Sequence, residues 1–145
     1  MTDWERKFIS EQRVARLATV DANGQPAVIP IVYAFDGAAF FTPLDAKPKS
    51  VPVDQLQRVK NINANPSVAI IIDSYNEDWS RLAWVHLRGQ ARIISNGDEF
   101  TAGITLLSEK YQQYENMPLD GRPLIMIEPT AIRSWRAYDT AAIIT

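Results

Sequence analysis

Four basic residues lie close together in one part of the sequence, although the chain as a whole is mildly acidic. Lys47 and Lys49 are followed by Arg58 and Lys60, with Asp54 as the one acidic residue between the first and the last of them. The formal net charge of the whole chain is −2. Because guanidinium and ammonium groups bind phosphate well, these residues form a candidate anion site. A solvated basic surface is the alternative interpretation.

A hydroxyl group and a stiff peptide segment accompany these cations. Thr42 ends the segment FFT, which follows an Asp-Gly turn and has the composition of a strand. A hydroxyl at a strand end adds a hydrogen-bond donor for a phosphate oxygen. Pro48 stands between Lys47 and Lys49 and limits how far this loop can fold back on itself.

Aromatic residues form a second group that could bind a ligand. Trp79 and Trp84 bracket Arg81 in the segment NEDWSRLAWVHLRG. Tryptophan rings can stack on a planar ligand, and arginine can hold an anionic one. Packing in a core or an interface is the alternative for both tryptophans, and we favour it for Trp84.

The sequence offers little for other kinds of catalytic chemistry. His86 is the single histidine and there are no cysteines, which excludes disulfides, thiolate metal sites and multi-histidine metal sites. We interpret His86 as a structural or surface residue, because no partner for it is evident. The sequence contains no nucleophile elbow, P-loop, dinucleotide fingerprint or paired-carboxylate motif, and we predict no catalytic residue and no metal site. An enzyme of this kind would need a cofactor to supply its chemistry.

Composition places the chain among ordinary globular proteins. It has 145 residues, of which 46% are hydrophobic and 22% charged, and we expect one domain spanning residues 1–145. The N-terminal segment lacks the features of a signal peptide, and no apolar run approaches the roughly 20 residues of a membrane span, so we expect a cytoplasmic protein. The acidic total argues against a nucleic-acid partner.

Turn and spacing signals divide the first part of the chain into a helix and three strands. Thr2 and Glu5 have the spacing of a capping box, which predicts a short helix ending near Glu11. Pro30 lies inside the second expected strand and predicts an edge position or a bulge there. The three strands, joined by hairpin turns at DANG and at Asp36-Gly37, are expected at residues 14–20, 26–35 and 38–42.

The second part of the chain alternates strands and helices. Asp54 can cap a helix over residues 54–65, and the strand 67–73 is apolar on both faces. Gly89 indicates a bulge, and Pro129 a kink. The order of elements favours a small antiparallel barrel over a parallel α/β sheet. The remaining elements are a strand at residues 82–94, a long helix from about 98 to 116 and a final strand at 123–135.

These motifs, in this order, resemble the flavin and deazaflavin split-barrel family, whose founding member is pyridoxamine 5′-phosphate oxidase. ARLATVDANGQPAVIPIVYAFDG resembles the first hairpin of that family, and RVKNINANPSVAIIID its basic-x-basic-Asn pattern. DAKPK and EDWSRLAWV resemble a subfamily of probable F420-dependent enzymes. The resemblance covers Val14 to Trp135. It implies a mainly β (α+β) fold, a six-stranded antiparallel split β-barrel with peripheral helices.

The resemblance also implies a bound cofactor, F420 or FMN, in a homodimer. The positions that match phosphate contacts are Thr42, Arg58 and Lys60, with Asn61 in the same motif. Pro30, Ile31 and Val32 match a strand whose backbone lines the ring system of the cofactor. Lys47 and Lys49 match a loop beside the phosphate or the part of the cofactor that extends beyond it. Trp79 and Arg81 match a segment that often comes from the partner subunit.

We therefore expect an oxidoreductase of the pyridoxamine 5′-phosphate oxidase-like class. It would use F420 or FMN to move a hydride to or from a small organic substrate, and Lys47 and Lys49 favour F420, whose anionic tail continues beyond the phosphate. A homodimer is also expected because strand 67–73 needs a partner to cover its second apolar face. The alternatives are a non-catalytic flavin or deazaflavin carrier or sensor, and a barrel that binds nucleic acid. The residues that hold pyridoxamine phosphate in the true oxidase are not recognisable here.

Overall fold

A computed structural model describes residues 1–44, 52–119 and 121–137. The helices are α1 (Asp3–Glu11), α2 (Gln57–Ala64) and α3 (Asp98–Lys110). Three short 3-10 turns are η1 (Val53–Gln55), η2 (Trp79–Arg81) and η3 (Gln112–Glu115). The strands are β1 (Ala15–Val20), β2 (Pro26–Ile31), β3 (Ala34–Phe35), β4 (Phe40–Pro43), β5 (Ser67–Ser74), β6 (Ala83–Ile94) and β7 (Leu124–Arg136).

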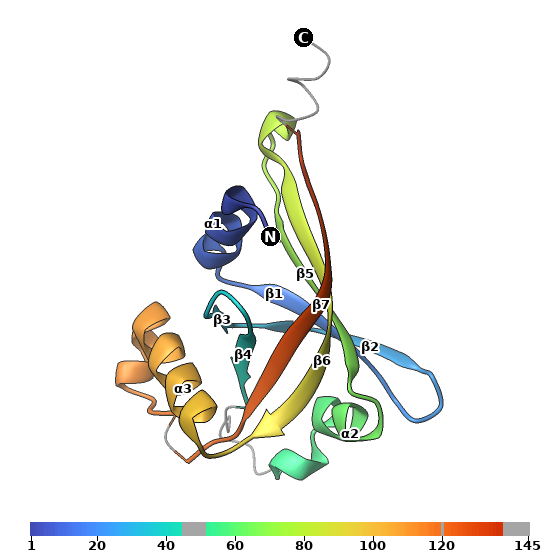
Figure 1. The fold of residues 1–145 in the computed structure, drawn as a ribbon, viewed down its shortest axis with the longest axis vertical. Helices are drawn as coiled ribbons and strands as arrows, with labels where there is room; N and C mark the ends of the chain where they lie inside the picture. The colour runs from blue at the N-terminus through green and yellow to red at the C-terminus, as the bar shows by residue number, and fades with distance from the viewer. Residues whose placement is uncertain (45–51, 120, 138–145) are drawn as a thin grey trace.

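The strands form one antiparallel sheet in the order β2-β1-β5-β6-β7-β4-β3. The sheet curls into a half-barrel, with the helices on its outside (Figure 1). Beyond the barrel, β5, β6 and β7 continue together as a long arm that points upward in this view. The predicted mainly β split barrel is thus confirmed. No helix in the described part of the chain is long and apolar enough to span a membrane.

The described sheet has seven strands where six were predicted, because the expected strand 26–35 is divided. Its first part, β2, pairs with β1, and its second part, β3, pairs with β4. Only Val32 and Tyr33 separate the two, so one stretch of chain lies at both edges of the sheet and closes it. Pro30 lies on the edge strand β2, as predicted, and such a strand tolerates proline because only one of its sides is paired.

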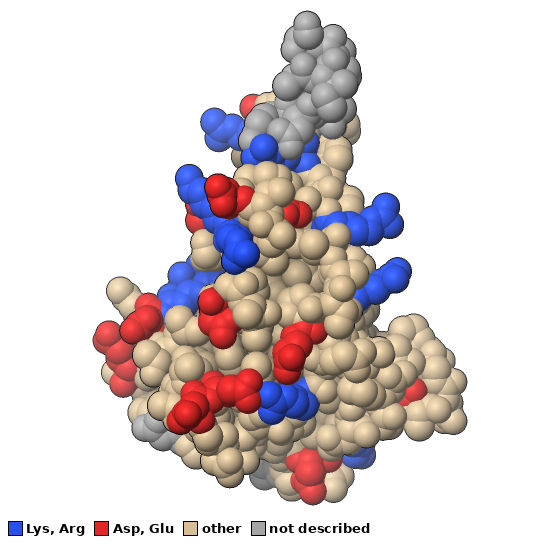
Figure 2. All heavy atoms as spheres, in the orientation of Figure 1, with Lys and Arg blue, Asp and Glu red and all other residues tan. Residues whose placement is uncertain are grey.

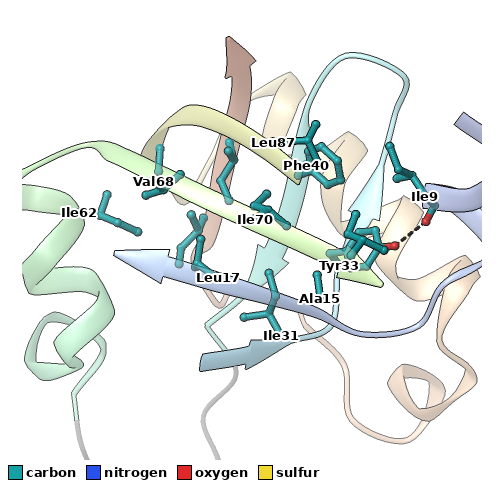
Figure 3. Packing of buried hydrophobic residues seen from close by; sticks show 14 of the residues in the cluster. Ile9, Ala15, Leu17, Ile31, Tyr33, Phe40, Ile62, Val68, Ile70 and Leu87 are labelled. Atoms are coloured by element: carbon teal, nitrogen blue, oxygen red, sulfur yellow. Dashed lines mark hydrogen bonds between the residues drawn. The ribbon is translucent and has the colours of Figure 1, made fainter. Parts of the chain in front are cut away.

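The break between β2 and β3 has a physical cause in two tyrosines. The N–H of Tyr33 donates to the hydroxyl of Tyr111 (3.2 Å). The single proton of that hydroxyl is within hydrogen-bond distance of two carbonyl oxygens, those of Arg13 (2.8 Å) and Tyr33 (3.1 Å). The Tyr33 hydroxyl in turn donates to the carbonyl of Ile9 (Figure 3). Burial raises the pKa of Tyr33, so this hydroxyl stays a donor. The two side chains therefore join α1, the link between α1 and β1, the strand break and the end of α3.

Lys110 adds a cation to the same junction. Its ammonium nitrogen lies 3.9 Å from the centroid of the Tyr33 ring, within range of a cation–π contact. Burial and the nearby Arg13 guanidinium lower the pKa of Lys110 to about 8. The end of α3 is therefore fixed to the barrel by aromatic faces. This also explains why the helix predicted to reach residue 116 ends at Lys110, since Tyr111 leaves the helical conformation to reach Tyr33.

The main core fills the inside of the barrel (Figure 3). Alternate residues of β5 point into it, namely Val68, Ile70 and Ile72, and all three are buried. On the opposite face of β5, Ile71 is only half-buried in the single chain. A second core lies between α3 and the sheet, where Gly103 allows the helix to approach closely, because a Cβ there would lie 2.6 Å from the Phe41 ring.

Two helix starts test the capping predictions. The predicted capping box of α1 is present: Glu5 N–H donates to the Thr2 hydroxyl, and Thr2 N–H to the Glu5 carboxylate (2.6 Å). Burial alone would raise the pKa of Glu5, but hydrogen bonds from Ser134 and Thr2 outweigh it and lower that pKa below its usual value. The predicted cap of α2 was wrong. Asp54 lies in η1, and α2 follows Leu56 with no side-chain cap.

Gly89 lies at the predicted bulge, where the register between β6 and β7 shifts. A Cβ at this position would lie 2.6 Å from the backbone oxygen of Glu128.

Gly89→Ala should therefore lower the free energy of unfolding by about 1–3 kcal/mol, because the paired backbone of β7 must move to make room for the added methyl group. The measurement is urea unfolding. Thr130→Ala on the same bulge is the control, because it removes only a 3.4 Å bond to Arg88. Equal unfolding midpoints for Gly89→Ala and the native protein would show that the strands relax freely.

Candidate functional site

Thr42, the predicted hydroxyl of the phosphate site, lies at the end of β4. It is 2% exposed and is paired with Ile125 of β7. It shares a strand face with Phe40 and Leu44, which belong to the barrel core, so its side chain points toward the barrel interior. The end of β4 and helix α2 both lie at the lower end of the barrel (Figure 1). The predicted loop cations Lys47 and Lys49 lie outside the described residues.

Helix α2 carries the other two predicted phosphate contacts, Arg58 and Lys60. Val59 between them is buried in the core, together with Ile62. Successive helical residues are about 100° apart, so Arg58 and Lys60 flank the buried face on opposite sides. Lys60 is exposed and Arg58 half-buried. The structure therefore brings both cations to the lower end of the barrel, but not onto a single helix face.

Asn61 is buried and bonded within the chain. Its amide nitrogen donates to the hydroxyl of Thr19 on β1 (2.9 Å), and its amide oxygen accepts from the Gln57 amide (2.7 Å). Both residues of the Asn61–Thr19 pair are at most 2% exposed. These bonds give Asn61 a structural role, because they hold α2 on the barrel. Its contact with a cofactor stays a prediction.

The strand predicted to line a ring system is the edge strand β2 and the residue after it. Pro30 is exposed, Ile31 faces the barrel core, and Val32 is half-buried against the second core. β2 has a strand neighbour on one side only. The backbone on its other side is therefore not used by a strand of the described sheet, which suits a segment that contacts a ligand through its backbone.

Trp79 and Arg81 lie at the opposite end of the molecule from Thr42 and α2. They belong to η2, at the tip of the arm formed by β5 and β6 (Figure 1). Trp79 is 68% exposed and its indole N–H lies 3.4 Å from the hydroxyl of Tyr75, which is 65% exposed. Arg81 is exposed, and its Nε atom lies 3.9 Å from a carboxylate oxygen of Asp78. Within one chain, the predicted partner-subunit residues and the predicted phosphate residues are therefore not brought together.

Charge is unevenly distributed over the surface. On the face shown in Figure 2, basic side chains gather mostly in the upper half, along the arm, and acidic ones at the lower left over α3. The arm therefore presents basic and aromatic groups, although the net charge of the chain is negative.

A groove on the outer face of the sheet was not predicted. It encloses about 780 Å³ over β1, β5, β6 and β7. Strand register places Arg16, Ile71, His86 and Arg133 side by side in one row across the four strands. The Arg16 guanidinium pairs with the Asp73 carboxylate at 2.6 Å. The groove is lined by Arg16, Ile71, Asp73, Trp84, His86, Arg88 and Arg133.

The groove has the chemistry to hold an anionic planar group or to face another protein surface. Three arginines outnumber its one carboxylate, and Trp84 supplies an aromatic wall. The alternation of residues 82–94 was the available sequence signal, because it puts Trp84, His86 and Arg88 on one face. Their four-strand row could not be read from sequence. Among the described residues, no group of three or more His, Cys, Asp or Glu side chains could hold a metal ion.

Comparison with known families gives one extended match. Residues 1–136 match the family model described as "Pyridoxamine 5'-phosphate oxidase". The sequence matches none of the curated proteins with which it was compared.

Solved structures with the same fold have diverse descriptions. A conserved hypothetical protein from Mycobacterium tuberculosis is 22% identical, with a TM-score of 0.76 over 97% of this chain and 88% of that one. The heme storage protein HutZ from Vibrio cholerae is 16% identical, with a TM-score of 0.71 over 92% of each chain. A FAD-binding protein from Mesorhizobium loti is 18% identical, with a TM-score of 0.69 over 92% and 94%. At these identities the likeness concerns the fold alone.

The structural role of Asn61 can be measured without any cofactor. Asn61→Ala should lower the free energy of unfolding by about 1–3 kcal/mol, because the buried Thr19 hydroxyl loses its partner. Thr19→Val should also be destabilising, and the double variant should cost less than the sum of the two. Asn63→Ala, at an exposed position of the same helix, is the control. The assignment is wrong if urea unfolding of the Asn61 and Asn63 variants is alike.

Proposed function

Because the chain belongs to the pyridoxamine 5′-phosphate oxidase family, we propose that it binds F420 or FMN in a homodimer. We further propose that it is an oxidoreductase, in which the bound cofactor transfers a hydride to or from a small organic substrate. The observation that carries the proposal is the family match over residues 1–136. The basic motif of this chain supports it, since its cations and Thr42 lie at one end of the barrel.

The residues at the lower end of the barrel fit an anionic cofactor tail. Arg58 can donate to phosphate oxygens as a fork, and Lys60 as a point charge. Thr42 offers a hydroxyl, although its side chain is almost fully buried. Lys47 and Lys49 would extend the basic region along a longer tail such as that of F420. The backbone of Pro30, Ile31 and Val32, at the edge of the sheet, would line the ring system.

The distance between the two ends of the molecule supports a homodimer. Trp79 and Arg81 lie at the arm tip and Thr42 at the lower end of the barrel, so one cofactor could contact both sets only if they came from different chains (Figure 1). The outer groove and the half-buried Ile71 give a second copy a surface to cover. Exposed Trp79 and Tyr75 at the tip suit contact with another chain, since tryptophan and tyrosine are enriched at interfaces.

The second candidate function is a non-catalytic flavin or deazaflavin carrier or sensor. It is favoured by the lack of any group that we can assign as a general acid or base among the described residues of the site. Similar folds occur in a FAD-binding protein and in a heme storage protein. Steady-state turnover with a chemical reductant and model acceptors separates the two functions. Tight cofactor binding without turnover would favour the carrier.

Cofactor binding should depend on α2. Arg58→Ala and Lys60→Ala should each weaken binding of F420 or FMN by about ten- to a hundredfold, because each removes a charge-assisted contact. Calorimetry with both cofactors measures this, and Arg6→Ala on α1 is the control. Lys47→Ala/Lys49→Ala should weaken F420 more than FMN, and the effect should fade with added salt. Unchanged affinity in both α2 variants would refute the phosphate assignment.

The homodimer has a direct test in solution. Light scattering should give twice the 16.3 kDa mass of the chain at micromolar concentration. Ile71→Asp should give monomers, because it places a charge in the middle of the outer face. Met117→Asp, at an exposed apolar position away from that face, should leave the dimer intact. A native protein that scatters as 16.3 kDa would end the dimer proposal.

A further inference from the structure

Arg122 has a buried side-chain nitrogen that lacks a hydrogen-bond partner. Within the described ranges, its Nη1 atom is the one buried side-chain nitrogen or oxygen in this condition. The residue as a whole is half-buried. A guanidinium group cannot shed its proton to escape the cost of burial, so a dry N–H without an acceptor is unfavourable. A buried N–H without a partner in a folded protein indicates that an acceptor outside the chain, such as a ligand, binds there.

The backbone places Arg122 at the lower end of the barrel. Its N–H donates to the carbonyl of Leu119 (3.1 Å), and the next carbonyl, of Pro123, accepts from the N–H of Leu44 (3.1 Å). Register then pairs Pro43 with Leu124. Arg122 therefore stands directly before β7, beside the end of β4. In Figure 1 the start of β7 lies at the lower left, beneath α3, and α2 lies at the lower right of the same end of the barrel.

We infer that Arg122 binds an oxyanion group of the ligand, and that the unpaired Nη1 is the donor for it. A phosphate or carboxylate oxygen is the acceptor that a guanidinium group binds best. The inference rests on the proposed function, since the cofactor tail is the anionic group expected at this end. It adds a residue that neither the sequence motif nor the family resemblance assigned. Arg122 is a binding residue here, with no role in hydride transfer.

The stability of the protein should reveal this role before any cofactor is added. Inorganic phosphate should raise the melting temperature of the native protein by about 4 °C at ten times its dissociation constant. Arg122→Gln should melt at or above the native temperature in buffer without multivalent anions, because it removes the N–H that is buried without a partner. It should lose most of the shift caused by phosphate. Arg6→Gln, which removes an exposed arginine of α1, should keep the full shift.

A pair of ligands that differ in one group tests the contact itself. FMN carries a phosphate and riboflavin does not, while their ring systems are the same. Arg122→Gln should weaken FMN by at least about tenfold and leave riboflavin unchanged. Arg122→Lys keeps the charge without the fork and should show an intermediate loss for FMN. It also provides a folded variant if Arg122→Gln does not fold.

The results separate this inference from the proposed function. If the native protein binds neither FMN nor F420, the proposed function fails, while the phosphate shift still tests Arg122. The inference is overturned if phosphate stabilises native and Arg122→Gln proteins equally. It is also overturned if Arg122→Gln melts lower by the same amount with and without phosphate, because Arg122 would then have an internal structural partner. Equal loss of FMN and riboflavin affinity overturns it as well.

Discussion

The fold depends on the way in which one short segment closes the barrel. Residues 26–35 supply both edge strands, and the turn between them is fixed by Tyr33 and Tyr111. Their hydroxyl groups, one of them at the end of α3, bond to Ile9 of α1 and to Arg13 in the link between α1 and β1. A buried backbone N–H needs a partner, and here a tyrosine hydroxyl takes the place of a neighbouring strand. This closure therefore fixes α1 and the end of α3 against the barrel.

Closure also explains why the proposed anion-binding end is built from segments far apart in sequence. β4 ends beside the start of β7, and α2 is held on β1 by the Asn61–Thr19 bond. The hydroxyl of Thr42, the cations of α2 and the guanidinium of Arg122 thus reach one end of the molecule from three segments. An anion at this end would meet groups whose positions are set by the sheet, which lowers the entropy cost of binding.

Most local signals in the sequence predicted the elements well, although the cap predicted at Asp54 was wrong. Long-range contacts account for the errors at the end of α3 and after β2. The capping box of Thr2 and Glu5 and the bulge at Gly89 were confirmed, because their causes lie within a few residues or within one strand pair. The end of α3 and the break after β2 depend on a contact between Tyr33 and Tyr111, which no local pattern reveals. The outer groove depends on register among four strands, and the unpaired atom of Arg122 on burial. Neither the strand register nor the burial of a single atom can be predicted from residue type or spacing.

The tip of the arm and the lower end of the barrel lie at opposite ends of the folded molecule. In a dimer whose cofactor touches both, each site combines the tip of one copy with the barrel end of the other. A chain with a defective tip and a chain with a defective barrel end would then form mixed dimers. One of the two sites in such a dimer carries both defects and the other carries none. Two inactive forms of the protein, expressed together, would thus restore up to half of the sites in each mixed dimer.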